Sequence, residues 1–169
     1  MKQKGLQNLG NTCYLNSGLQ LIFACLAFNK YFIKGNFKSD ILREYQSTLQ
    51  EYQSESESYI SPRSIKKIVG KKNSLFRGYQ QNDSQEFMIY LLDILEMEIQ
   101  KSIKEGSIPS TLELVKGFPP IKMDNYVSRF FDTAIATHIT CLECGNISKS
   151  SNKHRFLIFH MFNEREQIL

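Results

Sequence analysis

The sequence of 169 residues has no tryptophan, only 4 prolines and 4 cysteines, and no long hydrophobic run. The most apolar stretch, from Leu19 to Phe28, contains Gln20 and is far shorter than the ~20 residues that cross a bilayer. A secretory signal is excluded as well, because the preceding stretch 5–17 is rich in Asn, Gln, Gly and Thr, where a short basic lead is required. We therefore expect no membrane partner.

Neither sign of charge is in large excess. Lysine and arginine total 21, aspartate and glutamate total 17, and the net charge is +4. The basic residues are scattered between 30 and 72 and in the last third of the chain, and they do not follow one helical face. Because a protein that binds a polyanion normally has a more lopsided charge, we expect no nucleic-acid partner.

The cysteines are too few and too unevenly spaced for the disulfide framework of a small secreted protein. Cys141 and Cys144 form a Cys-x-x-Cys pair, whereas Cys13 and Cys25 stand apart. This pattern predicts reduced thiols and a location in the cytoplasm or nucleus.

The composition is that of an ordinary globular domain, with 41% hydrophobic and 22% charged residues. Apolar residues at helical spacing predict helices over 13 to about 28, 40 to about 53, 61 to 70 and about 83 to 104. The segment Asp83-Ser-Gln-Glu86 has the form of a capping box at the start of the last helix. Apolar residues cover most of the circumference of this helix, which predicts packing on several sides.

Beyond a loop at 106–120, apolar residues recur at every second position and no longer at helical spacing. Alternation predicts a strand over Phe131–Thr140, a turn over 141–146, and further strands from Ile147 and over Phe156–Phe162. The chain is therefore expected to be helical for about 105 residues and β thereafter, an α+β fold in a single domain.

Cys13 lies at the first turn of the first predicted helix, with Asn11 or Thr12 as the expected N-cap. A thiol in this place faces unpaired amides and the positive end of the helix dipole, which favour the reactive thiolate. Cys13 is therefore a candidate nucleophile. The alternative is that Cys13 is a small buried hydrophobe, as lone cysteines often are.

Three blocks, in order along the chain, resemble motifs of the ubiquitin-specific proteases. Gly5-Leu-Gln-Asn-Leu-Gly-Asn-Thr-Cys-Tyr-Leu-Asn-Ser-Gly-Leu-Gln20 closely resembles the family's cysteine box, and Phe76-Arg-Gly-Tyr-Gln-Gln-Asn-Asp-Ser-Gln-Glu-Phe87 resembles its second motif. Cys141-Leu-Glu-Cys-Gly-Asn146 is similar to the first zinc-ligand pair of its fingers region. The resemblance implies part of a papain-like cysteine protease domain, with a helical thumb over about 1–125 and the start of the β fingers over about 126–169.

The resemblance also implies catalytic roles for Cys13 and Asn8. The family hydrolyses the peptide or isopeptide bond at the C-terminal glycine of ubiquitin, so ubiquitin or ubiquitinated proteins are the expected partners. Cys13 matches the nucleophile, and Asn8 matches the position whose side-chain amide joins the Cys backbone N–H in the oxyanion hole. The alternative for Asn8 is that it only shapes a turn next to Gly10. No cofactor is required for this chemistry.

Asp83 and Gln81 match family positions that bind the C-terminal tail of ubiquitin, whose arginines an aspartate can pair. Asp83 also caps its predicted helix, and the two roles are compatible. Cys141 and Cys144 have the spacing of half a structural zinc site. Tetrahedral zinc needs four ligands and no second Cys-x-x-Cys follows, so this ligand set is incomplete.

The histidines are the largest departure from the family. None of His138, His154 and His160 has the glycine and tyrosine neighbours of the family's general base, and Leu169 precedes the palm that carries this histidine box. Two hypotheses follow. The first is the truncated, nucleophile-bearing part of a deubiquitinase, with a second chain as one source of the histidine box. The second is an inactive remnant that binds ubiquitin or another partner.

Overall fold

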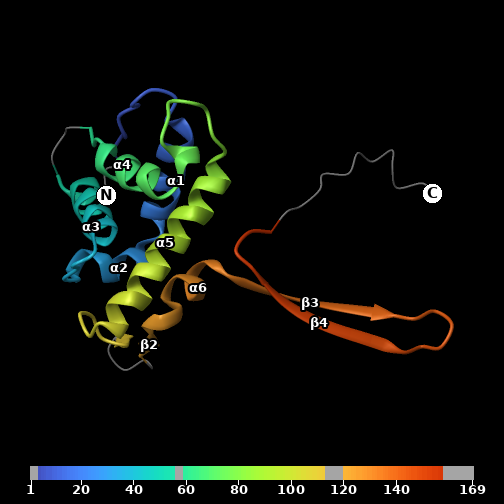
Figure 1. The fold of residues 1–169 in the computed structure, drawn as a ribbon. Coiled ribbons are helices and arrows are strands. Elements are labelled where there is room, and N and C mark those ends of the chain that lie inside the picture. Colours follow the sequence, from blue (N-terminus) through green and yellow to red (C-terminus); the bar gives the residue numbers. More distant parts are fainter. Residues whose placement is uncertain (1–3, 56–58, 113–119, 158–169) are drawn as a thin grey trace. The chain divides into compact units, whose positions relative to one another are not determined.

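The computed structural model describes residues 4–55, 59–112 and 120–157. It combines helices with antiparallel hairpins, which confirms the predicted α+β class (Figure 1). The chain divides into two compact units, residues 1–127 and 128–169. The described elements are α1 (Cys13–Ala24), α2 (Leu26–Lys34), α3 (Asp40–Gln53), α4 (Arg63–Lys72), η1 (Ser74–Phe76), α5 (Ser84–Lys104), β1 (Thr111–Leu112), β2 (Ile121–Lys122), η2 (Met123–Asn125), α6 (Tyr126–Phe131), β3 (Thr133–Thr140) and β4 (Ile147–His154).

The first predicted helix is broken at Cys25, where ψ is 79°. The expectation of a continuous helix to Phe28 is therefore wrong. A buried side chain explains the break, because the Asn29 amide donates hydrogen bonds to the carbonyls of Ile22, Phe23 and Cys25 at 2.8, 3.1 and 3.1 Å. The carbonyls of Ile22 and Cys25 also accept backbone hydrogen bonds, from the N–H groups of Cys25 and Asn29, so the Asn29 amide adds to the bonds that hold this break. The chain then starts again as α2.

Helix α4 continues two residues past the predicted end at Gly70. Gly70 does not end the helix. Its lack of a side chain instead permits close packing. A Cβ atom at this position would lie 2.9 Å from the Cα of Arg77, in the segment that follows η1. The glycine thus brings α4 against the chain that leads into α5.

Aromatic rings form the centre of the helical unit, residues 4–127. Phe28, Phe32, Tyr45 and Tyr126 are fully buried. The centroids of Phe32 and Tyr45 lie 4.7 Å apart, and those of Phe28 and Tyr126 lie 5.5 Å apart. The Tyr126 hydroxyl donates a hydrogen bond to the carbonyl of Phe28 at 2.6 Å, so this buried polar group is satisfied. The core therefore joins α2, α3 and the start of α6.

Helix α5 is packed on several sides, as its sequence predicts. It contacts α1, α3 and η2, and Figure 1 shows α1 lying beside it. Its buried residues are Phe87, Met88, Leu91, Leu92, Ile94, Leu95, Ile99 and Ser102. None of the helices in the described ranges has the length and apolar content needed to cross a membrane.

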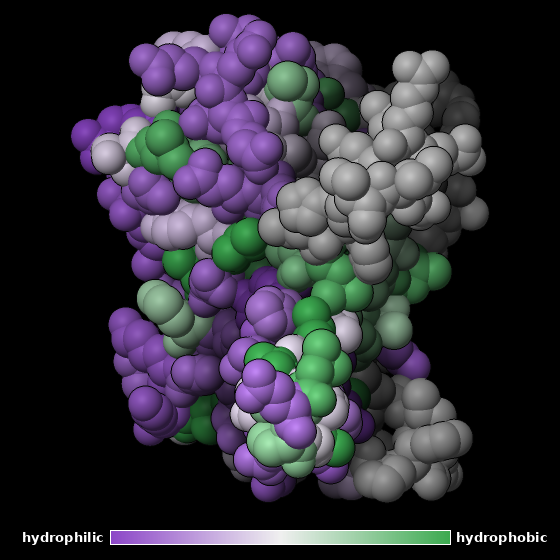
Figure 2. Space-filling model, turned by 90° about the vertical axis from the view of Figure 1, so that its right-hand side faces the viewer, coloured by the Kyte–Doolittle hydropathy of each residue, from purple (hydrophilic) through white to green (hydrophobic). Residues whose placement is uncertain are grey.

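The strands of the second unit form one antiparallel hairpin, in which Thr133 pairs with His154 and Thr140 with Ile147. The first strand was expected from Phe131, but this residue ends α6. Every residue of β3 and β4 is exposed, so the alternation in sequence does not produce a buried face. The described surface that faces the viewer in Figure 2 mixes hydrophobic with hydrophilic residues.

The third predicted strand, Phe156–Phe162, lies mostly outside the described residues. Phe156 belongs to a bend and Leu157 has no regular structure, so the predicted start of this strand is wrong. A short hairpin of β1 and β2 and the helix α6 were not predicted. These elements are too short for periodicity to show them.

Candidate active site

The side chain of Asn8 holds the loop before Cys13. Asn8 Oδ1 accepts hydrogen bonds from the N–H of Gly10 at 3.0 Å, from the N–H of Thr12 at 3.2 Å and from the Thr12 hydroxyl at 3.0 Å. Gly10 and Asn11 have φ values of 100° and 49°, in the left-handed region that glycine and asparagine tolerate. Asn8 therefore shapes this turn. Because the turn uses the carbonyl oxygen of this exposed side chain, the amide Nδ2 is available as a donor.

Cys13 is the first residue of α1, and its side chain is exposed. The alternative of a buried hydrophobe is therefore wrong. Thr12 is the N-cap residue, but its hydroxyl accepts a hydrogen bond from the N–H of Leu9 at 2.9 Å and makes no capping bond. The first N–H groups of a helix have no acceptor within the helix, so the thiol lies at an end rich in donors.

Hydrogen bonds join the loop before Cys13 to the segment before α5. The Asn11 side-chain amide donates to the carbonyl of Tyr79 at 2.9 Å. The Ser84 hydroxyl donates to the carbonyl of Tyr14, the residue after Cys13, at 3.0 Å. The structure thus brings the segment that carries Gln81 and Asp83 to the start of α1. No local pattern in the sequence marks Asn11, Tyr79 or Ser84 as residues that join distant segments.

Close packing holds these two segments in place. The ring of Tyr14 lies 5.9 Å from that of Phe76 and 5.6 Å from that of Phe87. On the next turn of α1, a Cβ atom at Gly18 would lie 2.8 Å from Cγ of Met88. Only a residue without a side chain permits this approach of α1 to α5. The position of Cys13 relative to α5 is therefore set by buried contacts.

Asp83 is the N-cap of α5, and its Oδ1 accepts a hydrogen bond from the N–H of Glu86 at 2.8 Å. The carboxylate is exposed and lines a cleft of about 340 Å³. The remaining lining residues are Asn73, Phe76, Gln85, Glu86, Ile89, Tyr90 and Asp93. With Glu86 and Asp93 beside Asp83, the cleft is acidic and suits a cationic ligand. Gln81 is exposed in the loop just before it.

Cys141 and Cys144 lie in the turn that joins β3 to β4. The turn is closed by hydrogen bonds from the Cys141 N–H to the Asn146 carbonyl and from the Gly145 N–H to the Cys141 carbonyl, both 2.9 Å. Hydrogen bonds from the backbone N–H groups of Cys144 and Glu143 lower the pKa of Cys141. Both thiols are exposed, and the lowered pKa favours the thiolate that a metal ion binds.

A family model described as "Ubiquitin carboxyl-terminal hydrolase" matches residues 4–164. The chain belongs to this family. It is similar to ubiquitin carboxyl-terminal hydrolase 4 of Pongo abelii, with 25% identity, and to ubiquitin carboxyl-terminal hydrolase 15 of Xenopus tropicalis, with 27% identity. Each alignment covers 98% of this chain but 19% of the relative. The chain therefore spans about a fifth of the length of these curated relatives.

In this member of the family, the unit that contains Cys13 has no histidine, because the histidines are at 138, 154 and 160 and this unit ends at Val127. His138 and His154 are exposed residues of β3 and β4, and His160 lies outside the described residues. The described part of residues 1–127 thus holds Cys13, Asn8, Gln81 and Asp83, but no imidazole base.

Proposed function

We propose that this chain is the nucleophile-bearing part of a thiol-dependent deubiquitinase that cleaves the peptide or isopeptide bond at the C-terminal glycine of ubiquitin. The observation that carries this proposal is the loop 8–12, which leaves Cys13 exposed at the start of α1 and is bonded to the segment of Asp83. In this assignment the fold is papain-like. Residues from 1 to about 125 form the thumb, and residues from about 126 to 169 begin the fingers.

The chemistry begins with attack of the Cys13 thiolate on the carbonyl carbon of the ubiquitin C-terminal glycine. The C–O double bond opens, and the oxyanion accepts hydrogen bonds from the Cys13 backbone N–H and the Asn8 Nδ2 amide. Collapse of the tetrahedral intermediate breaks the C–N bond and leaves a thioester, while the departing lysine amine takes a proton. Water then hydrolyses the thioester and regenerates the thiol.

The acidic cleft at Asp83 is the proposed site for the arginines of the ubiquitin tail. Charge-assisted hydrogen bonds between arginine and carboxylate are strong and directional. Gln81 precedes the cleft in an exposed loop and adds neutral donors and acceptors for the extended tail. The capping bond of Asp83 uses Oδ1, so Oδ2 stays available for a ligand.

Cys141 and Cys144 are the proposed ligands of a structural zinc ion, which would tie the end of the hairpin to further ligands. Within residues 4–55, 59–112 and 120–157, no cluster of three or more His, Cys, Asp or Glu side chains is arranged to hold a metal. The two thiols are therefore half of a ligand set. The proposed zinc takes no part in catalysis.

The proton transfers need a base that the unit of Cys13 does not contain. In the proposed reaction this base is a histidine supplied by further polypeptide, either in the same protein or in a second chain. The lack of a histidine in this unit also supports a second candidate function, in which the chain binds ubiquitin or a partner without cleaving it.

Cleavage of ubiquitin that carries a C-terminal fluorophore tests the proposal. We expect negligible turnover by the 169-residue chain, because general acid–base catalysis contributes ~10²–10⁴-fold. Turnover should appear when a polypeptide with the histidine box is added and should vanish in Cys13→Ala. Robust turnover by the chain alone would show that one of its own histidines is the base.

A ubiquitin probe with a C-terminal electrophile separates the two candidate functions. The protease proposal predicts a covalent adduct at Cys13, formed slowly in the isolated chain. Reversible binding of ubiquitin without an adduct, even with the histidine box present, would favour the binding role.

Asp83→Asn tests the tail site. Asparagine keeps most of the capping ability, so the free energy of unfolding should change by less than ~1 kcal/mol while ubiquitin binding weakens. Asp124→Asn makes the same charge change at an exposed residue of η2 and serves as the control. Loss of stability in Asp83→Asn with unchanged affinity would mean that the residue is only a cap.

A further inference from the structure

Helix α4 carries a row of three cations. Arg63, Lys67 and Lys71 follow one another at intervals of four residues, so they lie along one face of the helix. All three side chains are exposed, and within the described ranges no carboxylate forms an ion pair with any of them. The expectation that the basic residues follow no helical face is therefore wrong for α4.

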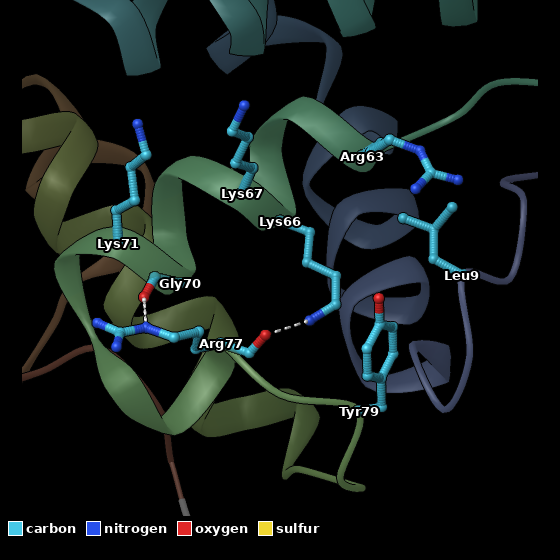
Figure 3. Close-up of a pocket in the computed structure, with 8 residues that line it drawn as sticks. All are labelled: Leu9, Arg63, Lys66, Lys67, Gly70, Lys71, Arg77 and Tyr79. Atoms are coloured by element: carbon cyan, nitrogen blue, oxygen red, sulfur yellow. Dashed lines mark hydrogen bonds between the residues drawn. The ribbon is translucent and has the colours of Figure 1, made fainter.

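The row borders a cavity of about 360 Å³ in the helical unit (Figure 3). The other lining residues are Leu9, Lys66, Gly70, Arg77 and Tyr79. The lining contains five cationic side chains and, among the described residues, no acidic one. Such a surface repels cations and attracts anions.

Lys66 forms the buried floor of this cavity. Its ammonium group donates hydrogen bonds to the carbonyls of Phe76 at 3.1 Å and Gly78 at 2.7 Å, and it lies 5.5 Å from the centroid of the Tyr79 ring. In Figure 3, Lys66 turns toward this ring, while Lys67 and Lys71 project together away from it. Burial lowers the pKa of Lys66. Burial thus disfavours the charged form of this ammonium group, and a nearby anion would stabilise that form.

We propose that the row and the cavity bind an acidic segment of another protein in an extended conformation. Residues four apart on a helix are separated by about 6 Å along its axis. Side chains on the same face of an extended chain are separated by about 6.6 Å, because they are two residues apart. Acidic residues at alternate positions of the segment therefore match the row, with one carboxylate for each cation.

The arrangement suits an acidic peptide better than other anions. A single phosphate needs donors that converge on one point, whereas this row extends over about 12 Å. Single-stranded nucleic acid has a similar charge spacing, but its binding sites stack successive bases on several aromatic side chains. Tyr79 is the aromatic residue in the lining, and its ring already faces Lys66. Leu9 adds an apolar contact that a peptide side chain fits.

The bound segment would lie next to the loop before Cys13. Leu9 belongs to this loop, and the Tyr79 carbonyl accepts the hydrogen bond from Asn11. The site is therefore placed to recognise a protein held near the nucleophile. The binding itself does not depend on the proposed hydrolysis, so it is measured without ubiquitin.

Fluorescence anisotropy with the full chain tests the proposal, using a labelled peptide in which glutamate alternates with serine. We expect Lys67→Glu with Lys71→Glu to weaken binding by about tenfold or more. The double variant Lys104→Glu and Lys122→Glu changes the net charge equally at exposed residues of α5 and β2, and it should alter binding less than about twofold. Lys67→Gln with Lys71→Gln should show an intermediate loss, with the same helical circular dichroism as the parent chain.

Three results would overturn the proposal. Equal weakening by both charge-reversal pairs would show that only net charge matters. Equal affinity for a peptide of the same composition with its glutamates in one block would remove the argument from spacing. An oligothymidylate that binds more tightly than the peptide, through Lys67 and Lys71, would make the site one for nucleic acid.

Discussion

In the helical unit, side chains such as Phe32 and Tyr45 are fully buried, whereas every residue of β3 and β4 is exposed. Both regions have a clear hydrophobic period in sequence. In the helices the apolar face meets other apolar faces and forms a core. In the hairpin, Ile135 and Ile139 keep 38% and 65% of their surface accessible, so cross-strand hydrogen bonds exist without a core beneath them. A hydrophobic period in the sequence thus predicts a helix or a strand. The apolar face of that element is buried only where a second apolar surface packs against it.

This difference predicts unequal sensitivity to mutation. A two-stranded hairpin alone is marginally stable, whereas the helical unit has its own aromatic core. Variants that remove the same kind of group from the two regions test this contrast.

The largest effect is expected for Phe32→Ala. Phe32 contacts the rings of Phe28 and Tyr45, and its removal leaves a cavity, so the free energy of unfolding should fall by ~3–5 kcal/mol. Ile139→Ala in β3 should change it by less than ~0.5 kcal/mol. Urea denaturation followed by helical circular dichroism measures both. Similar losses would mean that the hairpin shares the stability of the core.

Two buried tyrosines test how much a hydrogen bond of the hydroxyl group stabilises the helical unit. The Tyr45 hydroxyl donates a hydrogen bond to Asn29 Oδ1 at 2.6 Å, and Tyr45→Phe leaves that buried oxygen unpaired at a cost of ~1–3 kcal/mol. Within the described part of the chain the Tyr31 hydroxyl has no partner, and burial raises the pKa of Tyr31 to about 12. Tyr31→Phe should therefore leave the free energy of unfolding unchanged or raise it slightly. Thermal denaturation compares the two, and a larger loss for Tyr31→Phe would contradict this account.

The cysteines of the two regions should differ in their response to zinc. In metal-free protein, alkylation should modify Cys13 and Cys141 at least about tenfold faster than the half-buried Cys25. Zinc should protect Cys141 and Cys144 while leaving the rate at Cys13 unchanged. Peptide mapping by mass spectrometry measures each site. Protection of Cys13 by zinc, or none at Cys141, would refute the proposed metal site.

The smallest effect is expected at the base of the hairpin, where the Arg155 Nε lies 2.8 Å from the Asp132 Oδ1. Burial raises the pKa of Asp132, but hydrogen bonds from Arg155 and Ser128 outweigh it and bring the pKa below the ordinary 3.8. The carboxylate therefore stabilises the fold above this pH, and the contribution, at most ~1 kcal/mol, is lost as the pH falls below 3.8.

Nuclear magnetic resonance shifts of the β3 and β4 amides, followed from pH 6 to pH 3, report this loss. Asp132→Asn should remove the acid transition in the hairpin. Asp40→Asn, at an exposed pair with Arg43 in α3, should leave it in place. A hairpin transition that persists in Asp132→Asn would have another cause.

The sequence was sufficient to predict the elements whose signals are local. The bounds of α3 agree with its apolar stripe, and Asp83 is the N-cap of α5, as the capping pattern predicts. For Cys13 the sequence left a buried thiol open as the alternative, and the structure decided for exposure. The break at Cys25 was missed because the apolar period continues through it, while the buried amide of Asn29 determines where α1 ends.

Sequence alone determined the longer helices α3 and α5, the family motifs around Cys13 and Asp83, and the Cys-x-x-Cys turn, because each depends on residues a few positions apart. Tertiary structure decided that Asn11 meets Tyr79, that the cations of α4 border a cavity, and that β3 and β4 remain uncovered. These features depend on which surfaces the packed core brings together. A hydrophobic period repeats every 3.6 or 2 residues, so it carries no information about which distant segments come into contact.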